Sequence, residues 1–147
     1  MNTKAKQKQP ETPEEALASF LGIDLDEVNT SSHRQYDMPI FEVGNQEYLV
    51  CTDEEADAAV KEYIEQSVWA FNASFLASMT GVPEEAFSSL GTQCESANDW
   101  VLHLIEKTCG LDDFVEAAVS ADGRGHFLSG YDGNENESGE YYIYRTN

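Results

Sequence analysis

Residues 38–71 decide the fold, and their sequence is MPIFEVGNQEYLVCTDEEADAAVKEYIEQSVWAF. The first part contains two β-favouring runs on either side of Gly44-Asn45, a pair that readily adopts positive φ. Two such runs separated by two turn residues predict a β-hairpin over residues 38–51. We therefore expect an antiparallel sheet that includes this hairpin.

The second part of the stretch predicts the longest helix of the chain, over roughly residues 53–71. Thr52 and Glu55 have the spacing of a capping box, in which each side chain accepts a hydrogen bond from the other residue's backbone N–H. Apolar residues then recur at helical spacing and include Tyr63 and Trp69. We expect this stripe to face the core and the acidic side of the helix to face water.

Shorter elements are predicted on both sides of this stretch. Thr12 and Pro13 begin a short amphipathic helix that Gly22 ends, and an irregular acidic connection follows over residues 23–36. Further along the chain, capping residues and apolar spacing predict four short helices, over residues 72–79, 83–91, 96–108 and 112–120. In the helix that begins at Ser96, we expect Trp100 to face inward.

The C-terminal part predicts turns, a loop and a last strand. Asp122-Gly123 and Gly125 favour turns, residues 132–139 a polar loop, and residues 141–144 a strand beside the hairpin. The whole chain therefore predicts an α+β fold. A small antiparallel sheet, made of the hairpin 38–51 and the C-terminal strand, packs against several short helices and one longer helix.

Length and composition indicate one folded domain. The chain has 147 residues, of which 41% are hydrophobic and 11% aromatic, and this content argues against disorder. Residues 1–10 contain three lysines and no apolar run, so we expect a flexible basic leader. Residues 11–147 are then a single acidic domain.

The charge balance excludes several classes of function. The chain has 28 Asp and Glu against 8 Lys and Arg, a formal net charge of −20. Such a protein repels nucleic acids and anionic membranes and attracts basic partners. Because no apolar run approaches the roughly 20 residues of a membrane span, we expect a cytoplasmic protein. The sequence leaves the oligomeric state open.

The cysteines do not predict a metal site or a disulfide framework. They are three in number and lack CxxC spacing. A zinc site from Cys94, His103 and Cys109 is disfavoured, because the last two are six residues apart and lie on opposite sides of one helix. We expect no metal, no cofactor and no catalytic residues.

One alternative is a metal-dependent or acid–base site around Arg124, His126 and Asp132. Arg binds carboxylates or phosphates through two N–H groups, and His titrates near neutral pH. A tight structural connection is favoured instead, since the segment contains neither a phosphate loop nor a nucleophile elbow. Counted from Asp132, the sixth and twelfth positions are Glu137 and Ile143, where an EF-hand has glycine and glutamate. Weak cation binding by the loop from Asp132 to Glu140 is left open.

The preference of Asp and Glu for the first turn of helices explains only part of the acidic surplus. B-DNA carries one negative charge per roughly 1.7 Å, and a surface lined with carboxylates imitates that field. Adaptation to high salt and an ordinary acidic domain are the competing explanations. If the surplus serves a partner, we expect the binding surface to consist of Asp53, Glu54, Asp57, Glu62, Glu65, Asp112, Asp113, Glu116, Glu135, Glu137 and Glu140, with exposed aromatics such as Tyr131 or Tyr141 adding contacts.

Two motifs resemble a largely uncharacterised family of small acidic proteins from bacteriophages and mobile genetic elements. They are EYLVCTDEEADAAVKEYI at 47–64 and SADGRGHFLS at 120–129, the latter with YYIYR at 141–145. The resemblance supplies no catalytic residues. It implies a non-enzymatic inhibitor of a host defence system, anti-CRISPR or anti-restriction, in the host cytoplasm. Its partner would be a basic nucleic-acid-binding protein such as a Cas effector or a restriction enzyme. Two alternative functions are a host-takeover accessory protein and the metal-dependent domain described above.

Overall fold

The computed structural model describes residues 9–147, so the predicted leader lies mostly outside the described residues. The chain divides into two compact units. The first comprises Met1–Ala56 and Leu128–Asn147, and the second Asp57–Phe127. A domain is defined by cooperative folding, which a division into compact units does not measure. The single domain expected for residues 11–147 therefore stays a prediction.

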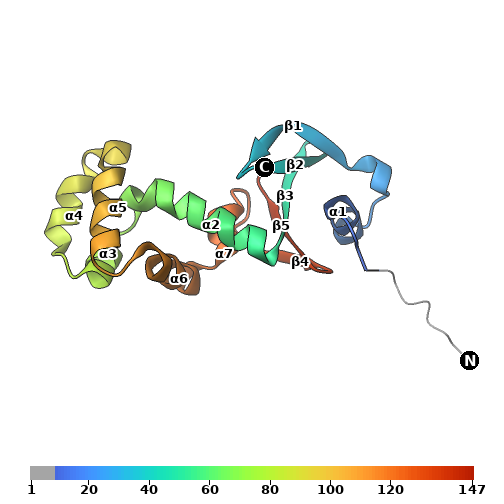
Figure 1. Cartoon of the computed structure of the whole chain (residues 1–147). Coiled ribbons are helices and arrows are strands. Elements are labelled where there is room, and N and C mark those ends of the chain that lie inside the picture. Colours follow the sequence, from blue (N-terminus) through green and yellow to red (C-terminus); the bar gives the residue numbers. More distant parts are fainter. Residues whose placement is uncertain (1–8) are drawn as a thin grey trace, which may run out of the picture. The chain divides into compact units, whose positions relative to one another are not determined.

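The first unit is built on a five-stranded antiparallel sheet with the order β1-β2-β3-β5-β4 (Figure 1). Its strands are β1 (Asn29–Gln35), β2 (Met38–Val43), β3 (Gln46–Thr52), β4 (Asn136–Ser138) and β5 (Tyr141–Arg145). Together with the helices described below, this sheet confirms the α+β fold class.

The predicted hairpin forms the centre of the sheet. Val43 and Gln46 are paired across the turn, where Gly44 adopts a φ of 59°. Strand β5 pairs with β3 on the other side, with Val50 opposite Ile143. The predicted C-terminal strand beside the hairpin is thus confirmed.

Helix α1 (Pro13–Leu21) covers one face of this sheet. The Thr12 hydroxyl accepts a hydrogen bond from the Glu15 backbone N–H at 3.2 Å, and Gly22 ends the helix at a φ of 67°. Ala16 and Leu17 bury their side chains against the sheet. They pack in one cluster with Phe41, Tyr48, Val50 and Ile143.

The irregular connection predicted over residues 23–36 is wrong. This segment contains a short 3-10 helix (Leu25–Glu27) and strand β1, which pairs with β2 through a tight turn at Tyr36 and Asp37. Both turn residues have positive φ, 53° and 59°, as a type I′ hairpin turn requires. Strand β1 was missed because it is a mostly exposed, polar edge strand with no apolar alternation.

The polar loop predicted over residues 132–139 is wrong in its second half. Strand β4 pairs there with β5, with Glu137 opposite Tyr142. Gly139, with a φ of 60°, lies in the turn between the two strands. Three polar residues form a strand here because β5 offers them a complete row of backbone partners.

The second unit consists of helices. Helix α2 (Asp53–Ser67) begins in the first unit and ends four residues before the predicted Phe71, and a 3-10 turn (Val68–Ala70) follows it. The others are α3 (Ala73–Thr80), α4 (Glu84–Gly91), a 3-10 helix (Cys94–Ala97), α5 (Asn98–Lys107), α6 (Leu111–Asp122) and α7 (Arg124–Leu128). Helix α3 packs against α4 and α5, and α5 packs against α6 (Figure 1).

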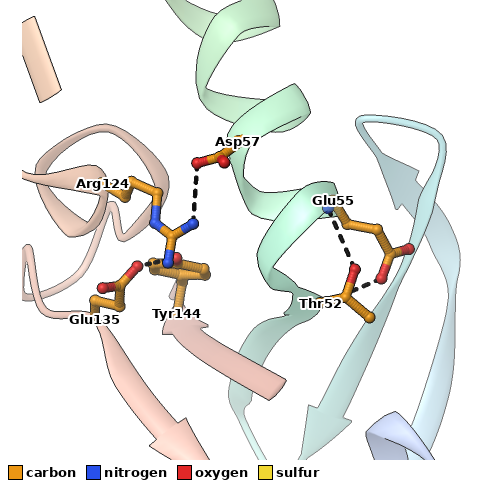
Figure 2. A network of polar contacts seen from close by, with 6 residues as sticks. All are labelled: Thr52, Glu55, Asp57, Arg124, Glu135 and Tyr144. Atoms are coloured by element: carbon orange, nitrogen blue, oxygen red, sulfur yellow. Dashed lines mark hydrogen bonds and ion pairs between the residues drawn. The ribbon is translucent and has the colours of Figure 1, made fainter. Parts of the chain in front are cut away.

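The predicted caps of α2 and α3 are confirmed. The Glu55 backbone N–H donates to the Thr52 hydroxyl at 3.2 Å, and the Thr52 N–H donates to Glu55 Oε1 at 2.9 Å (Figure 2). At the start of α3, Asn72 Oδ1 accepts from the Ser74 N–H at 2.8 Å. At the N-termini of both α2 and α3, side chains therefore accept hydrogen bonds from backbone N–H groups.

The predicted cap at Ser96 is wrong, and Asn98 has a different role. The Ser96 hydroxyl donates to the carbonyl of Gln93 at 2.6 Å. The Asn98 amide donates to the Glu65 carbonyl at 2.9 Å and accepts from the Trp69 N–H at 3.2 Å. Asn98 therefore pairs two backbone groups where α2 ends.

Two predicted core aromatics are exposed, and one predicted turn is helical. Trp100 is 65% exposed and Tyr63 39% exposed, because the apolar stripe on each helix is narrower than the spacing suggested. Gly123 ends α6 with a φ of 83°, as a turn residue, whereas Gly125 lies inside α7. Within residues 9–147, no helix is long and apolar enough to cross a bilayer.

We expect Thr52→Ala to lower the free energy of unfolding by about 1 kcal/mol, because it removes the side-chain acceptor at the start of α2. Urea denaturation followed by circular dichroism measures the change. Thr52→Ser keeps the hydroxyl and is the matched control. Equal loss in both variants would contradict a capping role.

We expect Asn98→Ala to cost about 1–3 kcal/mol, because the Glu65 carbonyl and the Trp69 N–H both lose their partner. The same denaturation measurement applies. Ser96→Ala, two residues earlier on an exposed side chain, serves as control and should change stability by less than about 0.5 kcal/mol. A similar loss in both variants would show that Asn98 has no special role.

Candidate acidic binding surface

The eleven carboxylates predicted as a binding surface are distributed over both units. Five belong to the first unit, namely Asp53, Glu54, Glu135, Glu137 and Glu140, and six to the second, namely Asp57, Glu62, Glu65, Asp112, Asp113 and Glu116. All are exposed except Glu65, which is partly buried. The structure brings three of them to one place.

Asp57, Asp112 and Glu116 line a hollow of about 280 Å³ between α2 and α6. Its other lining residues are Val60, Val115, Val119 and Ser120. We call this hollow the acidic groove. Its apolar floor and carboxylate rim suit a Lys or Arg side chain, whose aliphatic stem packs on apolar surface while the charged end reaches a carboxylate.

The sequence contained a signal for this groove. Asp112 and Glu116 are four residues apart on α6, and so are Val115 and Val119. Residues four apart share one side of a helix, so the two pairs form adjacent acidic and apolar stripes. Both valines are only partly buried, so the apolar stripe is open at the groove.

Two basic residues bind carboxylates of the acidic groove. Lys61 Nζ lies 2.8 Å from Asp112 Oδ1. Arg124 lies 3.0 Å from Asp57 Oδ1, and Figure 2 shows this second pair. The hydrogen bond to Asp112 and its negative charge raise the pKa of Lys61 above its usual value. Among the residues that the structure describes, Glu116 has no ion-pair partner.

The second unit nevertheless has a large acidic surplus. Residues 57–127 contain twelve Asp and Glu and three Lys and Arg, a balance of −9. Lys61 and Arg124 are already bound at the acidic groove, which leaves Lys107 for all other carboxylates of the unit. The field around this unit is therefore negative over most of its surface.

The acidic residues near the C-terminus have structural contacts of their own. Glu135 accepts a hydrogen bond from the Tyr144 hydroxyl (Figure 2). Glu137 lies in the edge strand β4, and Glu140 follows Gly139 in the turn between β4 and β5. Of the suggested aromatic contacts, Tyr131 is 58% exposed with Arg145 stacked 3.5 Å above its ring, and Tyr141 donates to the Glu11 carbonyl.

No single unit contains all three residues of the alternative site. Arg124 and His126 belong to the second unit, where His126 is exposed and contacts Phe127 edge-on at 4.9 Å. Asp132 belongs to the first unit and accepts hydrogen bonds from the Ser129 hydroxyl at 2.8 Å and the Asn134 N–H at 2.9 Å. Within residues 9–147, no group of three or more His, Cys, Asp or Glu side chains is arranged to hold a metal ion.

Comparison with known proteins gives no match to a family model, to a curated protein or to a solved structure. The resemblance to small acidic phage proteins therefore stays a prediction.

We expect Asp132→Asn to lower stability at pH 7 by less than about 1 kcal/mol, because the side chain is largely exposed. Hydrogen bonds from Asn134 and Ser129 hold the pKa of Asp132 below its usual 3.8. Its charged form therefore stabilises the folded state above pH 3.8, and this contribution is lost as the pH falls through the lower folded pKa. Urea denaturation at pH 7 and pH 2.5 should show a smaller difference between wild type and variant at the lower pH. A difference independent of pH would show that Asp132 acts through shape alone.

Proposed function

We propose that this protein is a non-enzymatic inhibitor from a phage or mobile element. It binds the basic nucleic-acid-binding surface of a host defence protein, a Cas effector or a restriction enzyme, and blocks it. The observation that carries the proposal is the acidic surplus of the second unit, twelve carboxylates against three cations, together with the acidic groove.

The distribution of charge supports a partner more than solubility alone. Solubility requires only a moderate net charge, whereas a balance of −9 on 71 residues adds self-repulsion to the folded state. Such a field steers a basic partner during diffusional encounter and raises the association rate. A protein that must capture an enzyme before the enzyme finds DNA gains directly from fast association.

The acidic groove supplies a contact that charge alone does not. Its valines offer apolar surface to the stem of a partner's Lys or Arg. The ion pair between Lys61 and Asp112 is exposed, and exposed pairs contribute little to stability. A partner's cation therefore replaces Lys61 at Asp112 with little loss to the fold.

Trp100 favours a second candidate, a host-takeover accessory protein that binds through apolar contacts. This side chain is 65% exposed on α5, and Trp is enriched among the residues that contribute most to interfaces. Binding through Trp100 would depend weakly on salt, which separates this candidate from the first.

The test is inhibition of DNA cleavage by a panel of purified Cas effectors and restriction endonucleases. The variant Glu62→Gln/Glu65→Gln/Asp113→Asn/Glu116→Gln removes four negative charges from α2 and α6, the two helices that form the acidic groove, and leaves both ion pairs in place. We expect inhibition of at least one enzyme, relieved by excess DNA, and a loss of tenfold or more in the variant. The association rate should also fall about tenfold or more between 50 and 500 mM NaCl, because salt screens the field.

The matched control is Glu84→Gln/Glu85→Gln/Glu95→Gln/Glu106→Gln, which removes the same charge from α4, α5 and the 3-10 helix between them. It should retain most of the inhibition. Equal loss in both variants would mean that net charge acts without a defined surface. Absence of inhibition across the panel, or binding indifferent to salt, would overturn the proposal.

A further inference from the structure

A second hollow of the second unit is lined by aromatic rings. Tyr63, Phe71 and Phe127 line it together with Asn72, Asp122 and His126, and its volume is about 220 Å³. An adjoining hollow of about 240 Å³ shares Phe71, Asn72 and Asp122 and adds the ring of Phe75. We call the two together the aromatic trough.

The rings of the aromatic trough form one packed group. Phe71 and Phe127 have centroids 6.1 Å apart and planes only 21° from parallel, and Tyr63 lies 5.9 Å from Phe127. These distances are typical of favourable aromatic pairs. A planar group that stacks parallel to Phe71 is therefore nearly parallel to Phe127 as well.

Asp122 gives the aromatic trough its charge. Its carboxylate is exposed and lines both hollows, and the residues lining them include no Lys or Arg. Asp122 is also the last residue of α6. A carboxylate at a helix C-terminus is unfavourable, because the last carbonyls carry partial negative charge. The charge of Asp122 therefore does not stabilise α6, and its presence there needs another reason.

We infer that the aromatic trough binds the guanidinium group of an arginine side chain on the protein's partner. Arginine combines a planar cation that stacks on aromatic rings with N–H groups that bind a carboxylate, whereas an ammonium group cannot stack. Each of the two adjoining hollows, of about 220 and 240 Å³, has room for a side chain. The identity of the partner rests on the proposed function, but arginine binding itself does not.

The test is a titration of the full chain at pH 8 with N-acetyl-arginine amide, followed by ¹⁵N and aromatic ¹³C NMR. N-acetyl-citrulline amide has the same shape without the charge and is the matched ligand control. We expect saturable shifts confined to residues around Tyr63, Phe71 and Phe127, with a dissociation constant of roughly 1–10 mM. Citrulline should bind at least fivefold more weakly.

Variants separate a binding role of Asp122 from a structural one. Asp122→Asn should weaken arginine binding about fivefold or more while the melting temperature stays equal or rises, since the unfavourable charge at the end of α6 is removed. Asp122→Glu should retain binding. Asp99→Asn, which removes the same charge from the first turn of α5, should change binding less than twofold.

Three results would overturn the inference: equal binding of citrulline, shifts that map elsewhere, or equal effects of Asp122→Asn and Asp99→Asn. The outcome is distinguishable from that of the proposed function. Arginine binding in the aromatic trough without inhibition of any defence enzyme would reject the proposed function alone. Inhibition without arginine binding would reject this inference alone.

Discussion

The shortage of cations is the constraint on which the rest of this structure depends. Residues 9–147 contain 28 carboxylates and five basic side chains, so ion pairs can neutralise only a few of them. The fold instead uses backbone N–H groups: Glu15, Glu27 and Glu55 each accept one at the start of a helix, at 2.9–3.0 Å. Carboxylates at helix N-termini are stabilised by the partial positive charge there, so many short helices provide many such sites. The remaining carboxylates outnumber the cations, and they give the protein its negative electrostatic field.

The scarce cations are placed where they order particular elements. Arg124, only 11% exposed, binds Asp57 and so connects α7 to α2 within the second unit. Lys61 connects α2 to α6 through Asp112. In the first unit, Arg145 stacks on Tyr131 and binds the carbonyl of Asn147 near the chain end. Apart from the local bond to Asn147, these contacts join separate segments of the chain, whereas the capping carboxylates act within one turn.

Local signals predicted the parts of the fold that local physics determines. The Gly44-Asn45 turn, the capping residues Thr12, Thr52 and Asn72, and the β-favouring run at Tyr141 all led to correct elements. The errors arose where tertiary partners decide: β1 and β4 are polar strands that exist because a neighbour pairs with them, and the positions of Trp100 and Tyr63 depend on which helix packs beside them. For the binding surface, composition predicted the exposure of the carboxylates. The grouping of Asp57 with Asp112 and Glu116 could not be derived, because it joins residues 55 and more apart.

The polar edge strand β1 has a consequence for the protein's behaviour at high concentration. An open sheet edge exposes unpaired backbone groups that invite another chain to add a strand, the first step of aggregation. Here one edge carries the largely exposed run NTSSHRQ with a shift in its register, and the other is only three residues long. Irregular, hydrophilic or very short borders are poor templates for a further strand. The sheet therefore gives other copies of the chain little opportunity to add a strand.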